Sequence, residues 1–466
     1  MSQKKNLEQV ILIYTRPWFV DFYEVLASKM EVEFGYRVVF FSDYSMGKIH
    51  NISPKKSSIA KDNFKAENEF FDIIMRDRVL RNEPRNFSIA LLKQYQSNIS
   101  ALFEKYDVRF VFSATIDQFA IDMVYRHCLS LKIPFIGYHM SVIPGYTLLI
   151  NRGEHCYFRE PTENEVMAGT ELIFPKVFRP DYIPVKGKLR LVGLRRLLAN
   201  IARVPFFFCK DFFEVKYNYH YRASFKAAFS SIGLSVARLL FSSGYKIKDG
   251  DKFDIYIPLQ LHPECNSEYW SKDSEYLDYE DLIYRFCERY SKSFKICIKD
   301  HPNMVGLRKD IFFKKYRDLG VVVVDVEEDN RELIECSKVL VTYNSSAGIE
   351  GMVYGASILC LGKPYYKTDG HLSNEEEMVD VLRGGLEISK EKIKNDFLPD
   401  AIRQTLSMSI SGRLPDTTKL NDQSYENELD HKATIFLSEL KKNFPKIVAK
   451  KLTLDEVFTY RDVNHD

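Results

Sequence analysis

Two stretches of the chain alternate short apolar runs with amphipathic segments. In the first, residues 10 to about 150, the predicted strands are Val10–Tyr14, Tyr36–Phe41, Val108–Ser113 and Ile133–Gly137, and the predicted helices are Phe19–Met30 and Ile116–Leu131. In the second, residues 251 to about 400, the predicted strands are Phe253–Pro258, Phe294–Ile298, Val321–Val326, Val339–Thr342 and Ser357–Leu361, with helices at Tyr279–Tyr290 and Arg331–Cys336. Continuous apolar strands between amphipathic helices are typical of parallel sheets covered on both faces.

The rest of the chain is more polar. Residues 44–105 are mostly of helical pattern, and we expect them to lie outside the first sheet. The residues after 400 also favour helix, most clearly at Glu428–Lys442. Because 466 residues exceed one ordinary core, we predict four parts with bounds 1–180, 181–250, 251–400 and 401–466.

Residues 186–248 are strongly basic, although the whole chain has a net charge of only +2. This segment contains thirteen Lys and Arg residues but only two acidic residues, Asp211 and Glu214, and Phe and Tyr residues lie among them. Such a segment suits the surface of an anionic membrane. The alternative is a pair of linker helices with solvated charges. Nothing accompanies the charge that would indicate nucleic-acid binding.

Composition favours a cytoplasmic globular protein. Hydrophobic residues make up 45% and charged residues 28% of the chain. The apolar run Val10–Tyr14 is too short for a signal peptide, and we expect no membrane-spanning helix. Eight cysteines are scattered without a Cys-x-x-Cys pair, which indicates reduced structural cysteines.

Polar motifs follow two predicted strands of the second stretch. Lys299-Asp300-His301-Pro302 follows one strand, and Tyr343-Asn344-Ser345-Ser346 follows another and leads through small residues to Glu350. Small residues at a helix start let an anion approach free backbone N–H groups. Two such loops at one edge of a parallel sheet predict a site for a nucleotide phosphate.

These motifs resemble the capsule polysaccharide biosynthesis family of bacterial glycosyltransferases, most clearly over residues 250–365. The resemblance also includes Gln260 with Glu264, and the run Leu361–Tyr366. It implies an α/β GT-B fold, with two Rossmann-like domains facing across a cleft, a basic helical insert and a helical tail. The first domain would bind the acceptor, and the second the nucleotide-sugar donor.

In transferases of this family that use CMP-linked acidic sugars, a histidine and two serines hold the donor phosphate. The resemblance carries these roles to His301, Ser345 and Ser346. The remaining predicted donor-binding residues are Gln260, Lys299, Pro302, Asn344 and Glu350. Simpler alternatives are a strand-capping histidine, helix-capping serines and an exposed helical glutamate.

Glu264 is the main candidate for the catalytic carboxylate. The family's retaining Kdo (3-deoxy-manno-octulosonic acid) transferases have Gln-x-x-x-Asp where this chain has Gln260-x-x-x-Glu264. Glutamate can act as a nucleophile or general base, but its longer side chain shifts the oxygens. An ion-paired loop carboxylate is the alternative.

Strand ends of the first stretch supply candidates for the acceptor side. They are Arg16, Asp21, Asp117 and His139. Asp117 and Asp21 are candidates for the base of an inverting reaction, and the alternative for each is a structural role. With Glu264 and His301, Asp117 completes the set of candidate catalytic residues. Asp249-Gly250-Asp251 resembles a metal-binding motif, but it precedes its strand and predicts a turn. We therefore expect no metal and no cofactor besides the nucleotide-sugar co-substrate.

The sequence and this resemblance together predict a metal-independent glycosyltransferase that builds surface polysaccharide or lipopolysaccharide, with CMP-Kdo as a candidate donor. Its acceptor would be a glycan or a lipid-linked glycan. It would be cytoplasmic or peripheral on the inner face of the cytoplasmic membrane, through residues 186–248. The alternatives are a teichoic-acid-type glycerophosphotransferase, a nucleotide-sugar 2-epimerase and a non-catalytic assembly or export partner.

Overall fold

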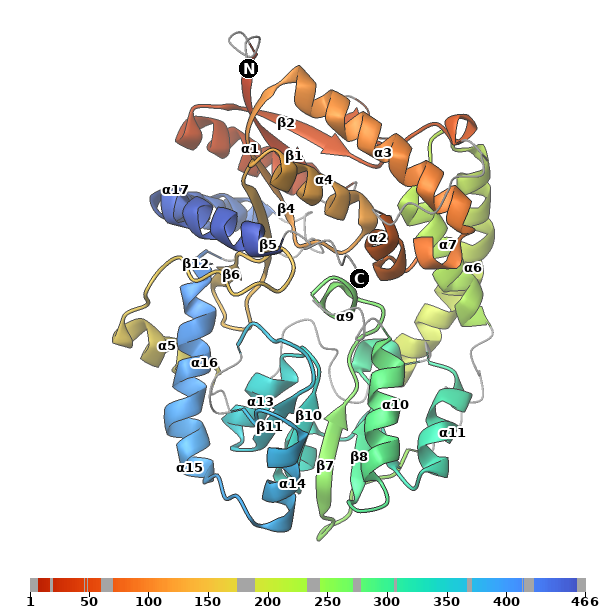
Figure 1. Ribbon diagram of the computed structural model, residues 1–466, viewed down its shortest axis with the longest axis vertical. Helices are drawn as coiled ribbons and strands as arrows, with labels where there is room; N and C mark the ends of the chain where they lie inside the picture. The colour runs from red at the N-terminus through yellow and green to blue at the C-terminus, as the bar shows by residue number, and fades with distance from the viewer. Residues whose placement is uncertain are drawn as a thin grey trace, which may run out of the picture. The chain divides into compact units, whose positions relative to one another are not determined.

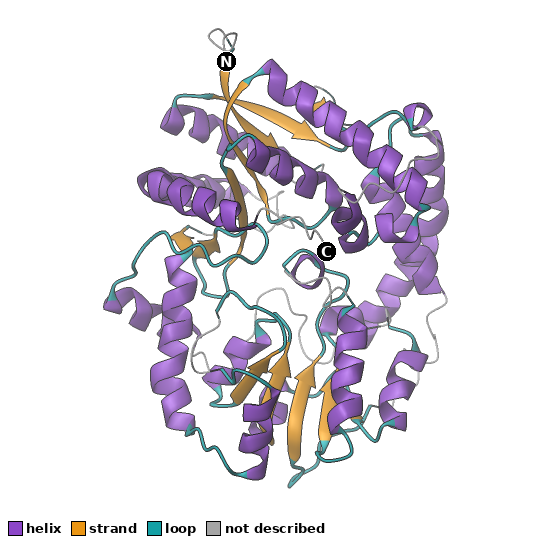
Figure 2. Ribbon diagram, viewed as in Figure 1, coloured by secondary structure: helices purple, strands orange, loops and turns teal. Residues whose placement is uncertain are grey.

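A computed structural model of the chain divides it into two compact units. The first comprises Met1–Pro161, Asp211–His220 and Thr405–Asp466, and the second comprises Thr162–Lys210 and Tyr221–Gln404. The structure describes residues 7–16, 20–45, 47, 49–59, 70–173, 189–232, 244–270, 278–305, 308–366, 371–412, 414 and 423–458. Both units combine helices with a sheet (Figure 2), which confirms the α/β class. The four-part division of the chain stays a prediction.

A seven-stranded sheet forms the centre of the first unit. Its strands are β1 (Gln9–Tyr14), β2 (Arg37–Ser42), β3 (His50–Asn51), β4 (Asp107–Ala114), β5 (Phe135–Met140), β6 (Tyr146–Leu148) and β12 (Ser409–Ser411). They lie in the order β12-β6-β5-β4-β1-β2-β3. The five from β3 to β5 are parallel, whereas β6 pairs antiparallel with β5 and β12. The parallel part is Rossmann-like.

Two short strands correct the sequence prediction. β3 lies within residues 44–105, which we expected outside the sheet, and it pairs with β2 at Phe41 and Ser42. β12 lies within the predicted helical tail, and it pairs with β6. Neither strand has an apolar run of its own. Each is held by backbone hydrogen bonds to a neighbouring strand, which a hydrophobic pattern does not reveal.

Helices cover both faces of the first sheet. They are α1 (Val20–Phe34), α2 (Phe71–Arg76), α3 (Arg85–Lys105), α4 (Phe119–Ser130) and α17 (Gln423–Phe458), with short 3-10 turns at Lys56–Ser58 and Leu80–Asn82. Side chains of α1 and α17 share one core with alternate residues of β1 and β4, such as Ile11 and Phe112. α3 and α4 lie on the other face (Figure 1).

A five-stranded parallel sheet forms the centre of the second unit. Its strands are β7 (Phe253–Pro258), β8 (Ile296–Lys299), β9 (Val322–Val324), β10 (Ser337–Thr342) and β11 (Ser357–Cys360), in the order β11-β10-β7-β8-β9. All five were predicted from their apolar runs. Side chains are buried on both faces of these strands, as a covered parallel sheet requires.

The second unit also contains several helices. They are α5 (Glu163–Ile173), α9 (Cys265–Glu268), α10 (Tyr279–Tyr290), α11 (Asp310–Asp318), α12 (Asn330–Glu335), α13 (Ala347–Val353), α14 (Glu375–Arg383), α15 (Lys390–Lys392) and α16 (Leu398–Ser407), with short turns of other helix types at Pro302–Met304 and Ile393–Phe397. α10, α11 and α14 pack into one core with β7, β8 and β10.

The basic segment is largely helical where the structure describes it. α6 (Leu189–Phe213) and α7 (Tyr219–Ile232) account for most of residues 189–232. The Asp249-Gly250-Asp251 motif forms the predicted turn, in which Gly250 has a φ of +89° and the Asp251 carboxylate accepts the backbone N–H of Lys248 at 2.9 Å. Within the described residues, no helix is long and apolar enough to cross a bilayer.

Candidate functional site

The strand order of the second unit creates a switch point between β7 and β10. Chain connections run outward from β7 in one direction to β8 and β9, and in the other to β10 and β11. In open α/β sheets, ligands bind beyond the carboxyl ends of the strands at such a point. Gln260 follows β7 and Asn344 follows β10. They meet there, because the backbone N–H of Asn344 donates to Gln260 Oε1 at 2.8 Å.

Buried amides surround this contact. Gln260 and Asn344 are 2% and 3% exposed. Asn344 Nδ2 donates to the carbonyl of Asn266 at 3.1 Å, and a Cβ at Gly362 would lie 2.2 Å from Asn344 Oδ1, so only glycine fits there. Among the described residues, Gln260 Nε2 and Asn344 Oδ1 have no hydrogen-bond partner. Buried polar atoms normally have a hydrogen-bond partner, so these two atoms can bind water or a ligand.

His301 begins the loop after β8. Its Nδ1 accepts the backbone N–H of Asn303 at 3.1 Å, so the ring caps the turn Pro302–Met304. The sequence left a strand-capping histidine as the alternative, whereas the ring caps the turn that follows the strand. The contact also fixes the tautomer, because a neutral ring that accepts at Nδ1 has its proton on Nε2. The ring is half-buried, and Nε2–H is the kind of donor that a phosphate oxygen accepts.

Arg308 links three parts of this edge, and the sequence prediction missed it. The guanidinium is buried and pairs with the Asp300 carboxylate. It also donates to the Gln260 carbonyl at 2.8 Å and to Glu280 Oε1 at 3.1 Å. The loops after β7 and β8 are therefore held together by one cation, whose pKa is raised by the nearby carboxylates despite its burial.

The two serines before α13 differ in their contacts. Ser345 Oγ accepts the backbone N–H of Ala347 at 3.2 Å, so it closes a local turn. Ser346 is the N-cap residue of α13, but its side chain makes no capping hydrogen bond. Both residues are half-buried. The Tyr366 hydroxyl donates to the Ser345 carbonyl, which fixes this turn against the loop after β11.

Lys299 and Glu350 lie close enough to influence one another. The Lys299 ammonium donates to the Glu328 carbonyl at 2.9 Å, and its charge lowers the pKa of Glu350. Burial acts more strongly in the opposite direction and raises the pKa of Glu350 to about 7. Glu350 Oε2 also accepts Asn330 Nδ2 at 3.1 Å. Glu350 is therefore held in the site and titrates near neutral pH.

We predict that Glu350 makes stability depend on pH. Its pKa is about 7 in the folded chain, against an ordinary value of 4.5. The folded state then binds more protons between these values, so the free energy of unfolding falls as pH rises from about 4.5 to 7. Glu350→Gln should remove this fall, on the order of 2 kcal/mol, and make the protein more stable than wild type at pH 8. Urea unfolding at pH 5 and pH 8 measures the effect, and equal pH dependence in both proteins would contradict it.

Glu264 begins the short helix α9 and is half-buried. Its backbone N–H donates to Ser267 Oγ at 3.3 Å, and the same hydroxyl lies 3.0 Å from His262 Nδ1. The loop that carries Glu264 is thus fixed by the buried Ser267. α9 also supplies the Asn266 carbonyl that binds Asn344, so Glu264 lies two residues from the switch-point contacts.

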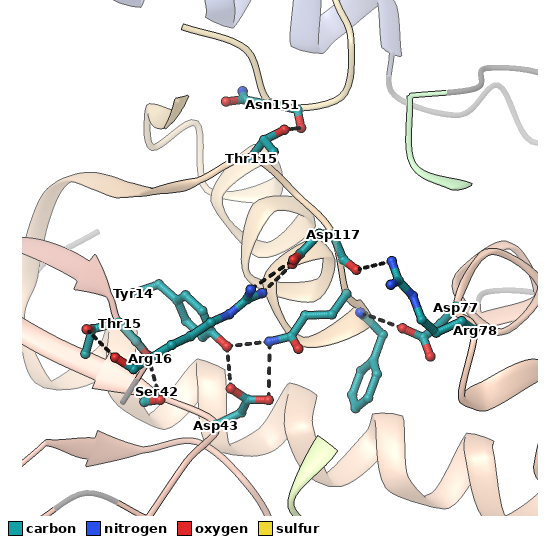
Figure 3. A network of polar contacts seen from close by, with 12 residues as sticks. Tyr14, Thr15, Arg16, Ser42, Asp43, Asp77, Arg78, Thr115, Asp117 and Asn151 are labelled. Atoms are coloured by element: carbon teal, nitrogen blue, oxygen red, sulfur yellow. Dashed lines mark hydrogen bonds and ion pairs between the residues drawn. The ribbon is translucent and has the colours of Figure 1, made fainter. Parts of the chain in front are cut away.

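In the first unit, Arg16 and Asp117 meet at the corresponding switch point between β1 and β4. Both guanidinium NH groups contact the Asp117 carboxylate, one of them at 2.9 Å (Figure 3). The Arg16 charge lowers the pKa of Asp117 and outweighs the effect of burial. A carboxylate held in this way is a weaker base than a free one. The geometry therefore favours a binding or positioning role for Asp117, whose catalytic assignment stays a prediction.

A second polar group beside this pair was missed by the sequence prediction. The Tyr14 hydroxyl donates to the Asp43 carboxylate, and Gln118 Nε2 donates to the Tyr14 hydroxyl and, at 3.3 Å, to Asp43 Oδ2 (Figure 3). Burial raises the pKa of Asp43 to about 6. Asp43 directly follows β2, so the rule that placed candidates at strand ends could have found it.

The other acceptor-side candidates are less well defined. His139 lies on β5, and burial lowers its pKa to about 4, although the nearby Asp117 charge raises it. It is therefore neutral at physiological pH. Asp21 lies in the first turn of α1, and its side chain is outside the described residues. Metal ligands do not cluster anywhere in the described part of the chain.

The structure thus brings together Gln260 with Asn344, Lys299 with Glu350, and Arg16 with Asp117. The predicted site residues at the second unit's edge all lie in loops or helix starts after β7, β8 or β10, except Lys299, which ends β8. Arg308, Asn266, Asn330 and Tyr366 complete this edge and were not predicted.

Comparison with solved structures gives weak matches over most of the chain. The KpsC β-Kdo 2,7 transferase of Thermosulfurimonas dismutans is 10% identical, with 91% of this chain and 99% of that one covered and a TM-score of 0.35. The β-Kdo 2,4 transferase of the same KpsC is 12% identical, with coverage of 90% and 97% and a TM-score of 0.35. The UDP-GlcNAc 2-epimerase of Neisseria meningitidis is 13% identical, with coverage of 96% and 100% and a TM-score of 0.22. Scores this low carry no argument about activity.

The sequence comparison is more specific. No curated protein matches the chain. A family model described as "Capsule polysaccharide biosynthesis protein" matches residues 241–383. This range contains the whole second sheet, from β7 to β11, and every predicted donor-side residue. Residues 241–383 of the chain are therefore similar to the capsule polysaccharide biosynthesis family.

Proposed function

We propose that the protein is a glycosyltransferase of bacterial surface polysaccharide synthesis. It takes a sugar from a nucleotide-activated donor and transfers it to a growing glycan or a lipid-linked glycan. The observation that carries the proposal is the buried contact between Gln260 and Asn344 at the switch point of the second unit, where two side-chain polar atoms have no partner among the described residues. The family match over residues 241–383 supports the same conclusion.

The donor-side residues have distinct roles in this proposal. His301 Nε2–H and the hydroxyls of Ser345 and Ser346 hold the donor phosphate and stabilise the charge that grows on it as the sugar leaves. Glu264 is the catalytic carboxylate. Glu350 binds a ribose hydroxyl, and its position next to Lys299 and Asn330 supports a fixed orientation.

Arg16, Asp117 and His139 form the acceptor side, where the Arg16–Asp117 pair presents a fixed polar edge. CMP-Kdo is the first donor to test, and no metal takes part in the proposed reaction. The enzyme works at the inner face of the cytoplasmic membrane, where a lipid-linked acceptor is accessible.

Thermal unfolding in the presence of CMP, CDP, UDP, GDP and their sugar-linked forms tests the proposal. A ligand that binds the folded chain raises its unfolding temperature, and at a concentration a hundred times Kd the stabilisation is about 2.7 kcal/mol. We expect one nucleotide family to do so. His301→Ala should remove most of that shift. The shift is measured from the variant's own nucleotide-free unfolding temperature, because the substitution also removes the cap of the turn Pro302–Met304. His431→Ala, an exposed histidine on α17, is the matched control.

The rival functions predict other results. A preferred CDP-linked polyol would indicate a glycerophosphotransferase, and conversion of a free UDP-sugar into its 2-epimer would indicate an epimerase. If no nucleotide shifts the transition, the protein is not a nucleotide-dependent transferase and the scaffold alternative stands.

A further inference from the structure

The outward face of α6 is unusually apolar for a helix on a protein surface. Six large apolar side chains of its first 22 residues are between 37% and 58% exposed. They are Leu191, Leu194, Leu198, Ile201, Phe206 and Phe208. All but Phe206 follow steps of three, four or seven residues, which places them on one stripe of the helix. The helix continues into Phe212 and Phe213, which are still more exposed.

The parts of α6 outside the stripe are already occupied. Leu197 is buried and forms a small apolar cluster with Val305 and Val326 of the same unit. Near the other end, Phe207 contacts Tyr221 of α7, with ring centroids 6.0 Å apart. α6 and α7 lie side by side in Figure 1. The exposed stripe is therefore not the side that attaches the helix to its own unit.

The exposed charges of α6 are all of one sign, because its one acidic residue, Asp211, is half-buried and paired with Lys56. Residues 189–210 contain five Lys and Arg residues and no Asp or Glu. Arg195, Arg203 and Lys210 are exposed beside the apolar side chains. A face that combines exposed Leu, Ile and Phe with cations alone complements an anionic lipid surface, in which apolar side chains enter the headgroup layer and cations meet the headgroups.

A second copy of the chain fits this face less well. In a symmetric pair the same patch meets itself, so the cations of one helix would face the cations of the other without an acidic partner. Phe206 also lies beside the stripe rather than on it, which makes the apolar arc wider than the seam of a coiled coil.

We propose that the outward face of α6, formed by the six apolar residues with Arg195, Arg203 and Lys210, binds an anionic phospholipid bilayer in the plane of its surface. The inference deepens the membrane location within the proposed function. Vesicle binding is measured without a sugar donor. A protein that does not bind vesicles can therefore still bind its nucleotide, and a protein that binds no nucleotide can still bind vesicles.

Cosedimentation with vesicles tests the charge contribution. The full chain should sediment with vesicles of phosphatidylcholine and phosphatidylglycerol at low salt, bind phosphatidylcholine alone much more weakly, and dissociate as salt rises. Each basic residue at such a surface contributes a factor of about five in affinity. The triple variant Arg195→Gln, Arg203→Gln, Lys210→Gln should therefore bind about a hundred times more weakly at low salt. The control is Arg285→Gln, Arg317→Gln, Arg331→Gln, three exposed arginines on other helices of the same unit.

Two further measurements test the apolar contribution. Leu198→Ser, Ile201→Ser, Phe206→Ser should lose binding. Val32→Ser, Met167→Ser, Ile311→Ser removes apolar side chains elsewhere that are even more exposed, and it should keep binding. Cys209 is exposed on α6, while the other seven cysteines are buried or half-buried. An environment-sensitive fluorophore on Cys209 should shift to the blue when anionic vesicles are added.

Several outcomes would overturn the proposal. The protein could bind neutral and anionic vesicles equally, or it could bind neither. The emission of the fluorophore on Cys209 could also stay unchanged when anionic vesicles are added. A wild-type dimer in sedimentation equilibrium that becomes a monomer in the Leu198, Ile201 and Phe206 variant would assign the face to a second copy instead. Circular dichroism establishes that each variant is folded, and the cation variant alters only exposed groups, so it remains informative if the apolar variant fails to fold.

Discussion

Glu264→Gln should reduce the turnover of sugar transfer by a hundredfold or more, while donor affinity changes little. Glutamine keeps the shape of the side chain but can neither accept a proton nor attack as a nucleophile, and the loss of one such group typically costs a factor of 10² to 10⁴. The Glu264 side chain forms a capping box with Ser267 at the start of α9, and the amide oxygen of glutamine can accept the same backbone N–H. The variant should therefore fold normally.

Steady-state kinetics with the donor identified by thermal unfolding measures this loss. Glu264→Asp should keep part of the activity, because it restores the carboxylate with a shorter reach, and aspartate is also a good N-cap residue for α9. Glu332→Gln, at an exposed position on α12, is the control. Full turnover in Glu264→Gln would move the catalytic group to another carboxylate, and Asp117 would be the next candidate.

Arg308→Ala should destabilise the second unit by about 3–5 kcal/mol, the range expected when one partner of a buried ion pair is removed. The substitution leaves the Asp300 carboxylate, which is 2% exposed, without its cation. It also removes the bond to the Gln260 carbonyl, so the switch-point contact should loosen and nucleotide affinity should fall. Arg308→Lys should recover only part of the stability, because an ammonium cannot reproduce the three-way contact of the guanidinium.

Tryptophan fluorescence makes this prediction measurable in the full chain. The sequence has two tryptophans, and Trp18→Phe leaves Trp270, a buried residue of the second unit, as the reporter. Denaturant unfolding is then compared with that of Arg317→Ala. Arg317 is 45% exposed and pairs with Asp310, so its loss should cost less than about 1 kcal/mol. Equal midpoints for the two variants would show that Arg308 does not stabilise the unit.

The hydrophobic pattern predicted the parts of the fold that have a strong local signal. The five strands of the second sheet follow from apolar runs such as Val339–Thr342, because a strand covered on both faces is apolar at nearly every position. β3 and β12 were missed because their two or three residues form strands only by pairing with a neighbour. Their signal lies in the partner strand and not in their own side chains.

The residues of the candidate site were also predicted only where the sequence carries a local signal. Gln260, His301 and Asn344 were predicted because strand ends of a parallel sheet meet at one edge. Arg308 was missed because its contact with Gln260 joins residues 48 positions apart, and its local sequence resembles any polar loop. Arg16 and Asp117 are 101 positions apart in the sequence. They were therefore predicted as two separate candidates, and the structure shows that they form an ion pair.

The position of β12 and α17 has a consequence for synthesis of the chain. The core of the first unit needs Ile410, Phe436 and Leu440 from the last part of the sequence, alongside Ile11 and Phe112 from the beginning. A ribosome therefore releases all of the second unit before the first unit can complete its core. We expect the second unit to fold first during translation, while one face of β1 and β4 stays partly uncovered, with α1 in place but α17 absent. Chaperones that hold apolar segments would act on this protein during that interval, and a premature stop before residue 409 would leave the same face exposed permanently.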